Sequence, residues 1–199
     1  MKIIKPSNGK VDESITGLFS TGSNRKLGPN TGNLNRRRMK TCPGSSEWCE
    51  ENCYANKALL KYWQNSYETE LKNIPNTLPK LVRLHSSGDF DTVPYIKWVE
   101  QLVEDNPKTR FWAYTRSWRL PSLRRELIKL KKMDNIEIFA STDPSIREPT
   151  PKGWRVAWVE TDNRAEGVYC PHDKGNVENC EECGICYEDS NKNVIFKKK

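Results

Sequence analysis

Long hydrophobic runs are missing from this sequence. No apolar stretch among its 199 residues approaches the roughly 18 residues that a membrane-spanning helix needs. The first ten residues, MKIIKPSNGK, reach Pro6 and polar side chains before an apolar segment of signal-peptide length can form. We therefore expect a cytoplasmic protein that has no membrane partner.

Hydrophobic residues are scarce, at 35% of the chain, which is below the share in a typical globular domain. A core of this composition depends on a few large side chains, and seven Trp, seven Tyr and five Phe fit that expectation. Three familiar catalytic signatures are absent as well, since there is no Walker loop, no GxSxG elbow and no HExxH helix. This argues against ordinary nucleotide-binding enzymes, serine hydrolases and zinc proteases.

Four short apolar segments predict the strands of a parallel sheet. They begin 30, 25 and 19 residues apart, spacings that suit crossover connections rather than hairpins. Helices are predicted between them, one capped by Asp91 with Pro94 in its first turn and one starting at Pro121. Apolar residues at helical spacing predict another helix from Tyr54 to Leu71. The four strands are LVRLH (81–85), FWAYT (111–115), IEIFA (136–140) and RVAWV (155–159).

This pattern favours an α/β fold, either a partial (βα) barrel or an open parallel sheet, because a complete eight-stranded barrel usually needs about 250 residues. We expect one domain over residues 1–199. Residues 1–41, rich in Gly, Asn, Ser and Lys, should form an irregular basic arm. Residues 42–162 should form the βα core, and residues 163–199 a cysteine-rich loop followed by a basic tail.

Positive charge gathers in two places within a chain of net charge +7. Arg36, Arg37 and Arg38 precede the first cysteine, and residues 197–199 are all lysine. Such an arm could bind nucleic acid. No aromatic residue interleaves with either cluster, so a solvated segment and a frayed tail are the simpler interpretation.

Each predicted strand is followed at once by small polar or charged residues, such as SSGD (86–89) and STD (141–143). Ligands of parallel α/β folds bind at the carboxyl ends of the strands, so this edge is the candidate site. His85 and Asp89 are candidates for proton transfer in a reaction with a small-molecule substrate. Helix capping and turns explain any one of these residues alone, and His85 could be a structural histidine. The candidate cofactor-binding residues are Ser87, Gly88, Thr115, Ser117 and Ser141.

Seven cysteines in a reducing compartment point to metal ligands or reactive thiols rather than disulfides, and the odd count agrees. Cys42, Cys49 and Cys53 are spaced C-x6-C-x3-C just before the predicted long helix. Three thiolates in such a loop can hold three corners of a 4Fe–4S cluster and leave the fourth iron open to a substrate or cofactor. Zinc with water or His as the fourth ligand would also fit.

The other four cysteines lie near the end of the chain, in CPHDKGNVENCEECGIC. They combine a C-x2-C-x2-C run with a separate Cys-Pro, the elements of the bacterial ferredoxin motif in another order. Structural zinc sites more often use two separate ligand pairs, so we favour iron–sulfur over zinc here. The division into three and four suggests two clusters, although loops from both ends could also meet around one. The four residues are Cys170, Cys180, Cys183 and Cys186.

In several segments the chain resembles the phage family called gene product 88. The matching segments are TCPGSSEWCEENCYA, VRLHSSGDF followed by YIKW, FWAYTRS, and CP with CEECGIC near the end. This resemblance implies a phage protein acting in the host cytoplasm, with a cysteine-ligated cluster and no firmly assigned reaction.

A more distant similarity is to radical S-adenosylmethionine enzymes, in which a three-cysteine loop precedes a partial (βα) barrel and a Gly-rich segment follows the second strand. SSGDF (86–90) is similar to that segment, whereas the C-x6-C-x3-C spacing departs from the C-x3-C-x2-C spacing typical of those enzymes. The similarity implies S-adenosylmethionine as a cofactor.

Two functional hypotheses follow. One is an enzyme whose open iron performs radical or Lewis-acid chemistry at the strand ends. The other is a non-catalytic protein in which metal stabilises the fold and the basic arm binds nucleic acid or a host protein.

Overall fold

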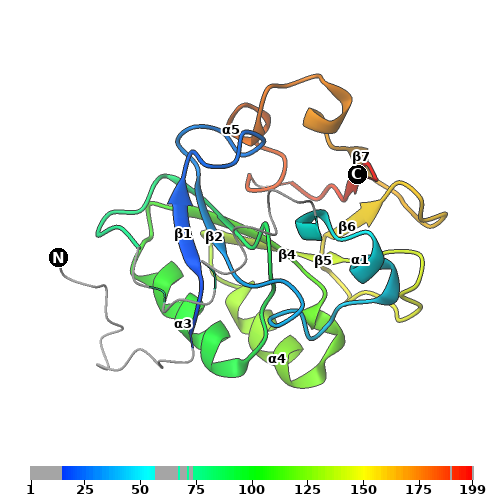
Figure 1. The fold of residues 1–199 in the computed structure, drawn as a ribbon, viewed down its shortest axis with the longest axis horizontal. Coiled ribbons are helices and arrows are strands. Elements are labelled where there is room, and N and C mark those ends of the chain that lie inside the picture. Colours follow the sequence, from blue (N-terminus) through cyan, green and yellow to red (C-terminus); the bar gives the residue numbers. More distant parts are fainter. Residues whose placement is uncertain (1–14, 57–66, 68–70, 72–73, 189, 199) are drawn as a thin grey trace.

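A computed structural model describes residues 15–56, 67, 71, 74–188 and 190–198. In this part of the chain, eight strands form one sheet in the order β1-β2-β3-β4-β5-β6-β8-β7 (Figure 1). The strands are β1 (Leu18–Thr21), β2 (Gly32–Asn35), β3 (Leu81–Leu84), β4 (Arg110–Thr115), β5 (Ile136–Ser141), β6 (Val156–Val159), β7 (Val168–Tyr169) and β8 (Val194–Phe196).

The sheet is mostly parallel and open. Only the pair of β1 and β2 is antiparallel, and the pairings from β2 through β7 are parallel. Among the described residues no pairing joins β7 to β1, so the strands do not close into a barrel. The predicted α/β class is confirmed, and so are the four strands predicted from apolar segments, within one or two residues at their ends.

Two helices, α3 (Val93–Glu104) and α4 (Pro121–Leu130), cover one face of the sheet (Figure 1). Their apolar sides pack on side chains of β3, β4 and β5 in the largest core of the described chain. Helix α4 begins at Pro121 as predicted. The N-cap of α3 is Thr92, whose side chain accepts a hydrogen bond from Tyr95 N–H, instead of the predicted Asp91, whose carboxylate pairs with Arg36.

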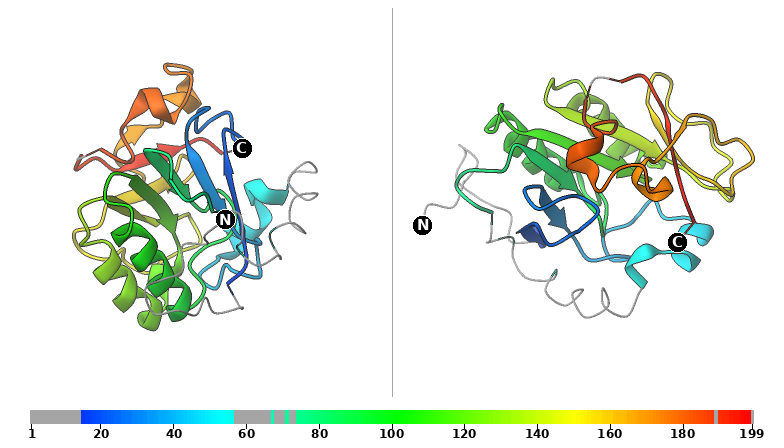
Figure 2. Two further views of the ribbon diagram at one scale, coloured as in Figure 1. Left: turned by 90° about the vertical axis from the view of Figure 1, so that its left-hand side faces the viewer. Right: turned by 90° about the horizontal axis from the view of Figure 1, so that it is seen from above.

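In the described part of the chain, the loop between β1 and β2 and the C-terminal segment cover the opposite face. Along β4, Phe111 and Ala113 point into the helix-covered core, whereas Trp112 and Tyr114 face the other way. There Trp112 packs with Leu27, from the loop between β1 and β2, and with Tyr187 from the C-terminal segment. Figure 2 shows this segment on the side of the sheet away from α3 and α4. The short helix α5 (Cys180–Cys183) and the 3-10 turn η4 (His172–Lys174) belong to it.

The expectation of an irregular arm over residues 1–41 is wrong for β1 and β2. Both lie in the sheet, and all four residues of β2, GNLN, are buried. Glycine and asparagine have low strand propensity and gave no alternating pattern. Their pairing is fixed instead by tertiary contacts, since Asn35 Oδ1 accepts a hydrogen bond from Ser87 N–H at 3.0 Å.

Two other expectations meet the structure in part. The helix predicted from Tyr54 to Leu71 falls largely outside the described residues, including Leu59, Leu60 and Trp63, while Tyr67 and Leu71 are buried. The segment 163–199 was expected to be loop and tail, yet β7, β8, η4 and α5 lie within it. None of the described helices combines the length and apolarity needed to cross a bilayer.

Candidate metal centre

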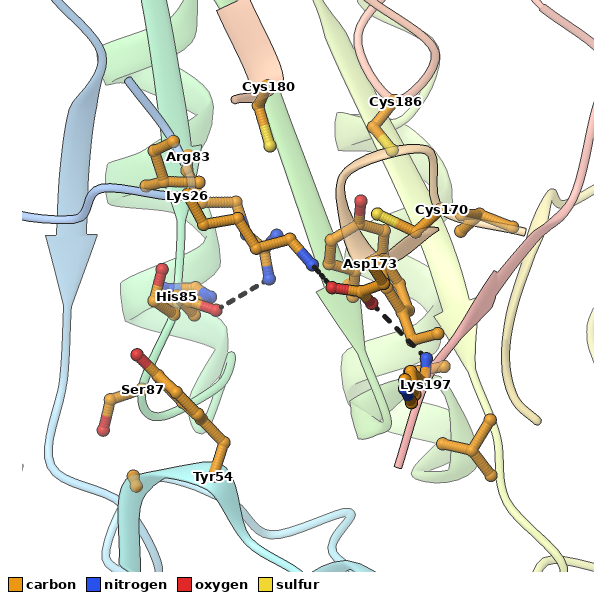
Figure 3. A pocket seen from close by; sticks show the side chains of 18 of the residues that line it. Lys26, Tyr54, Arg83, His85, Ser87, Cys170, Asp173, Cys180, Cys186 and Lys197 are labelled. Carbon is orange, nitrogen blue, oxygen red and sulfur yellow. Dashed lines mark hydrogen bonds and ion pairs between the residues drawn. The ribbon is translucent and has the colours of Figure 1, made fainter. Parts of the chain in front are cut away.

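All seven cysteines line a single cavity of about 350 Å³. The cavity lies over the carboxyl-terminal half of the parallel strands. Asp89 and Arg116, which follow β3 and β4, and Ser141, the last residue of β5, contribute to its lining. Figure 3 shows Cys170, Cys180 and Cys186 on one side of it. Cysteines more than 100 positions apart in the sequence therefore border one cavity.

One wall of the cavity, which we call the three-cysteine wall, carries Cys42, Cys49 and Cys53. It is built around the short helix α1 (Glu47–Glu51), where Ser46 is the N-cap and accepts a hydrogen bond from Cys49 N–H at 3.1 Å. The Ser46 hydroxyl donates in turn to Asp143 Oδ2 at 2.6 Å. Polar contacts thus attach this wall to the loop after β5.

Two further contacts hold the loop of the three-cysteine wall, at Gly44 and Ser45, against the segment after β4. Arg119 Nη1 donates to the carbonyls of Gly44 and Ser45, each at 3.2 Å. Gly44 approaches the backbone so closely that an added Cβ would lie 2.3 Å from Arg116 O. A side chain at position 44 would therefore displace the three-cysteine wall.

The opposite wall, the four-cysteine wall, carries Cys170, Cys180, Cys183 and Cys186. Cys180 and Cys183 lie at the two ends of α5, which is capped by Asn179, and Cys180 N–H donates to the carbonyl of Lys26 at 2.8 Å. The ammonium of Lys26 crosses to Asp173 at 2.8 Å, beneath the sulfurs (Figure 3). The loop between β1 and β2 thereby fastens the C-terminal cysteines in place.

The thiols influence one another within each wall. Burial raises the pKa of Cys42 to about 12, and Asp89, Cys49 and Cys53 act in the same direction. On the opposite wall, burial raises the pKa of Cys180 to about 12 and that of Cys186 to about 11, with contributions from neighbouring thiols. Among the described residues, no three His, Cys, Asp or Glu side chains are grouped so as to hold one metal ion in this structure.

His85 lies at the edge of the cavity in a left-handed backbone conformation, with φ of 64°. Its Nε2 is 2.6 Å from the hydroxyl of Tyr95, and its buried Nδ1 has no hydrogen-bond partner among the described residues. Burial lowers the pKa of His85 well below its usual value, and Arg36 and Arg83 add to the effect. The imidazole is therefore neutral at physiological pH.

Asp89 joins the loops that follow β3 and β4. Its carboxylate accepts hydrogen bonds from Phe90 N–H at 2.7 Å and Arg116 N–H at 2.9 Å. Burial raises its pKa, opposed by a hydrogen bond from Thr115 and by these amides. The carboxylate is thus both a backbone clamp and a neighbour of the three-cysteine wall.

The predicted cofactor-binding residues divide into two groups. Ser87, Gly88 and Ser141 line the cavity, whereas Thr115 and Ser117 are fully buried and are not part of its lining. Gly88 has a φ of 81°, and an added Cβ would lie 2.7 Å from Thr41 Oγ1.

Several cavity residues were not anticipated from the sequence. Lys26, Arg83 and Tyr114 border the four-cysteine wall, and Arg116 lies near Cys49. Arg83 and Tyr114 could have been found from the alternation of β3 and β4, which directs them away from the helix-covered core. For Lys26 there was no local signal, because its role depends on a contact with Asp173, 147 residues away.

Arg36 does not belong to a solvated basic arm. Its side chain is only 3% exposed, stacks over the ring of Tyr95 at 3.9 Å and pairs with Asp91. Nε also donates to the carbonyl of Thr16 at 2.9 Å. This arginine is occupied inside the protein and is not available to contact a phosphate backbone.

Comparisons with known proteins agree on one relationship. A family model described as gene product 88 matches residues 59–189. The Gene 88 protein of Mycobacterium phage L5 is 28% identical over 244 residues, covering 98% of both chains, and that of Mycobacterium phage D29 is 26% identical over 246 residues with the same coverage. No solved structure matches the chain.

Proposed function

The chain belongs to the gene product 88 family, and we propose that it is an iron–sulfur protein carrying two 4Fe–4S clusters in one cavity. The four-cysteine wall would ligate one cluster completely. The three-cysteine wall would hold the other and leave one iron open. The observation that carries this proposal is that all seven cysteines line the same cavity in two separate groups.

The surroundings of each wall support this assignment. A cluster bound by thiolates carries net negative charge, and each group has a cation beside it. Lys26 and Arg83 act on Cys180, and Arg116 acts on Cys49. Thiolates are the ligands that iron–sulfur clusters use, and the C-x2-C-x2-C run spaces three of them as in ferredoxins.

An open iron facing a cavity that a small molecule can enter suits an enzyme better than an electron carrier. A substrate entering the cavity would meet Asp89 next to the three-cysteine wall and the neutral imidazole of His85 at the edge. A neutral histidine with an unpartnered Nδ1 can exchange a hydrogen bond or a proton with that substrate. Cluster chemistry would supply either reductive cleavage of S-adenosylmethionine or Lewis-acid activation.

Anaerobic purification followed by iron and sulfide analysis tests the proposal. We expect a brown protein with iron and sulfide in equal amounts. Cys183→Ala and Cys53→Ala should each remove about half of both, because they fall in different groups. A colourless protein that contains zinc, or one in which either variant loses all its iron, would contradict the two-cluster assignment.

A second experiment separates the two chemistries. S-adenosylmethionine added to the reduced protein should yield 5'-deoxyadenosine if the open iron cleaves it, and the yield should vanish in Cys53→Ala. With the iron intact and no deoxyadenosine formed, the radical chemistry is excluded and Lewis-acid catalysis is the enzyme activity left to test.

A further inference from the structure

Arg83 is a cation without a carboxylate partner among the described residues. It lies on β3, on the face of the sheet that borders the cavity. Its Nη2 donates to the carbonyl of His85 (Figure 3) and its Nε to that of Leu84, each at 3.1 Å. Both contacts are to neutral backbone groups. Arg83 is partly buried, and removing a cation from water is costly unless an anion balances it.

The groups that could balance this charge belong to the four-cysteine wall and its neighbour. Burial lowers the pKa of the Arg83 guanidinium, while Tyr114, Cys180 and Cys186 act to raise it. Thiolates bound to a cluster carry negative charge and would balance this cation.

Tyr114 links the guanidinium to one of these sulfurs. Arg83 Cζ lies 4.0 Å from the centre of the Tyr114 ring, and the Tyr114 hydroxyl donates a hydrogen bond to Cys186. Phe139 and Phe196 contact the same ring at centroid distances of 5.0 and 5.1 Å, which fixes its orientation.

Resting on the function proposed above, we propose that Arg83 and Tyr114 are positioning residues that raise the reduction potential of the cluster on the four-cysteine wall. A reduced cluster carries one more negative charge than an oxidised one. A fixed cation and a hydrogen bond to a ligating sulfur both favour the more negative state, and these are the recognised determinants of cluster potential.

The test is a redox titration followed by electron paramagnetic resonance. The full-length chain carrying Cys42→Ala and Cys49→Ala removes the other cluster, so only the four-cysteine cluster reports. In this background, Arg83→Gln should shift the midpoint to more negative potential. Tyr114→Phe keeps the ring, loses the hydroxyl and should give a smaller shift in the same direction. Arg83→Lys should recover most of the parent potential.

Arg36 offers a matched control, since it also stacks on a tyrosine, at 3.9 Å from Tyr95, but it is not among the main influences on Cys180, Cys183 or Cys186. Arg36→Gln should lower stability and leave the midpoint unchanged. Should Arg83→Gln fail to fold, the midpoint potential of Tyr114→Phe still tests the inference. Iron present with unchanged midpoints in the variants overturns this inference alone, whereas a parent protein without iron overturns it together with the proposed function.

Discussion

The two cysteine walls of the cavity are held by different kinds of contact. The three-cysteine wall is attached through polar groups to the ends of the central strands. There the carboxylate of Asp143 accepts hydrogen bonds from the side chains of Ser46 and Arg116. The four-cysteine wall rests on aromatic rings, such as Trp112 and Tyr187, and on the loop that carries Lys26. The three-cysteine wall therefore lies at the carboxyl ends of the strands, and the four-cysteine wall lies across one face of the sheet.

If the protein binds clusters as proposed, this difference bears on how much each wall would depend on metal. The hydrogen bonds that hold the three-cysteine wall join protein groups to one another and need no metal. In the four-cysteine wall, α5 has four residues and β7 two, so regular structure contributes little. We infer that bound metal matters more for the order of the C-terminal segment.

Metal removal gives the largest expected effect. Stripping iron with a chelator under reducing conditions should cost the C-terminal segment stability on the order of 10 kcal/mol, the scale of structural metal sites. Hydrogen exchange should then show loss of amide protection over residues 170–187, with protection retained in β3 to β5. Cys53→Ala, which removes only the other cluster, should leave residues 170–187 protected. Equal loss of protection in both walls would erase the contrast between them.

Asp143→Ala should give the next largest effect. Its carboxylate is fully buried and accepts from Ser46 and from Arg116, the latter at 3.0 Å, so its removal leaves an uncompensated cation. We expect a loss of about 3–5 kcal/mol in the free energy of unfolding, measured by urea denaturation.

Asp162→Ala is the matched control for that substitution, because Asp162 is also buried and pairs with an arginine, Arg164, at 2.6 Å. Asp162→Ala should destabilise the protein and leave the iron content of the three-cysteine wall unchanged. Asp143→Ala should lower that iron content. Equal iron contents in the two variants would show that Asp143 does not position that wall.

The sequence predicted those elements whose burial shows in their own residues. Strands β3 to β6 were found because each is an apolar run, and α4 because Pro121 opens an amphipathic segment. Strand β2 was missed because its sequence, GNLN, has no alternation, and its burial comes from contacts with residues near β3.

The site was predictable as two cysteine groups but not as one cavity. Spacing identifies ligands that are local in sequence, as in Cys180 to Cys186. That these residues line the same cavity as Cys42 depends on how the C-terminal segment lies over the sheet, which is a tertiary property. The same holds for Lys26 and Arg83, whose neighbours are distant in the chain.

The pH dependence of stability should distinguish two buried aspartates near the three-cysteine wall. Although burial alone would raise the pKa of Asp143, hydrogen bonds from Ser46 and Ser145 and the charge of Arg116 lower it below the ordinary 3.8. Its contribution is therefore complete above that value and is lost as pH falls through the folded pKa. For Asp89 the pKa is raised, so its ionisation costs stability as pH rises from the ordinary value through the folded one.

Urea unfolding of the metal-free protein between about pH 3 and pH 7 would measure this contrast. The advantage of the parent over Asp143→Asn should shrink toward acid. The stability of Asp89→Asn relative to the parent should grow toward neutral pH. Parallel curves for the two variants would contradict the opposite pKa shifts. We expect these effects to be smaller than that of Asp143→Ala, because an asparagine keeps part of the hydrogen bonding.

Glu148→Gln should have the smallest effect. Glu148 pairs with Arg119 at 2.7 Å, but its side chain is 50% exposed, and exposed ion pairs contribute about 0–1 kcal/mol. Arg119 also donates to the carbonyls of Gly44 and Ser45, so Arg119→Ala should cost more, about 1.5–3 kcal/mol, and should loosen the three-cysteine wall. Urea denaturation of both variants measures the difference. If Glu148→Gln cost as much as Arg119→Ala, the three-cysteine wall would be held by a surface ion pair instead of by contacts to the backbone. The stability of this wall in the metal-free protein would then decrease as salt is added.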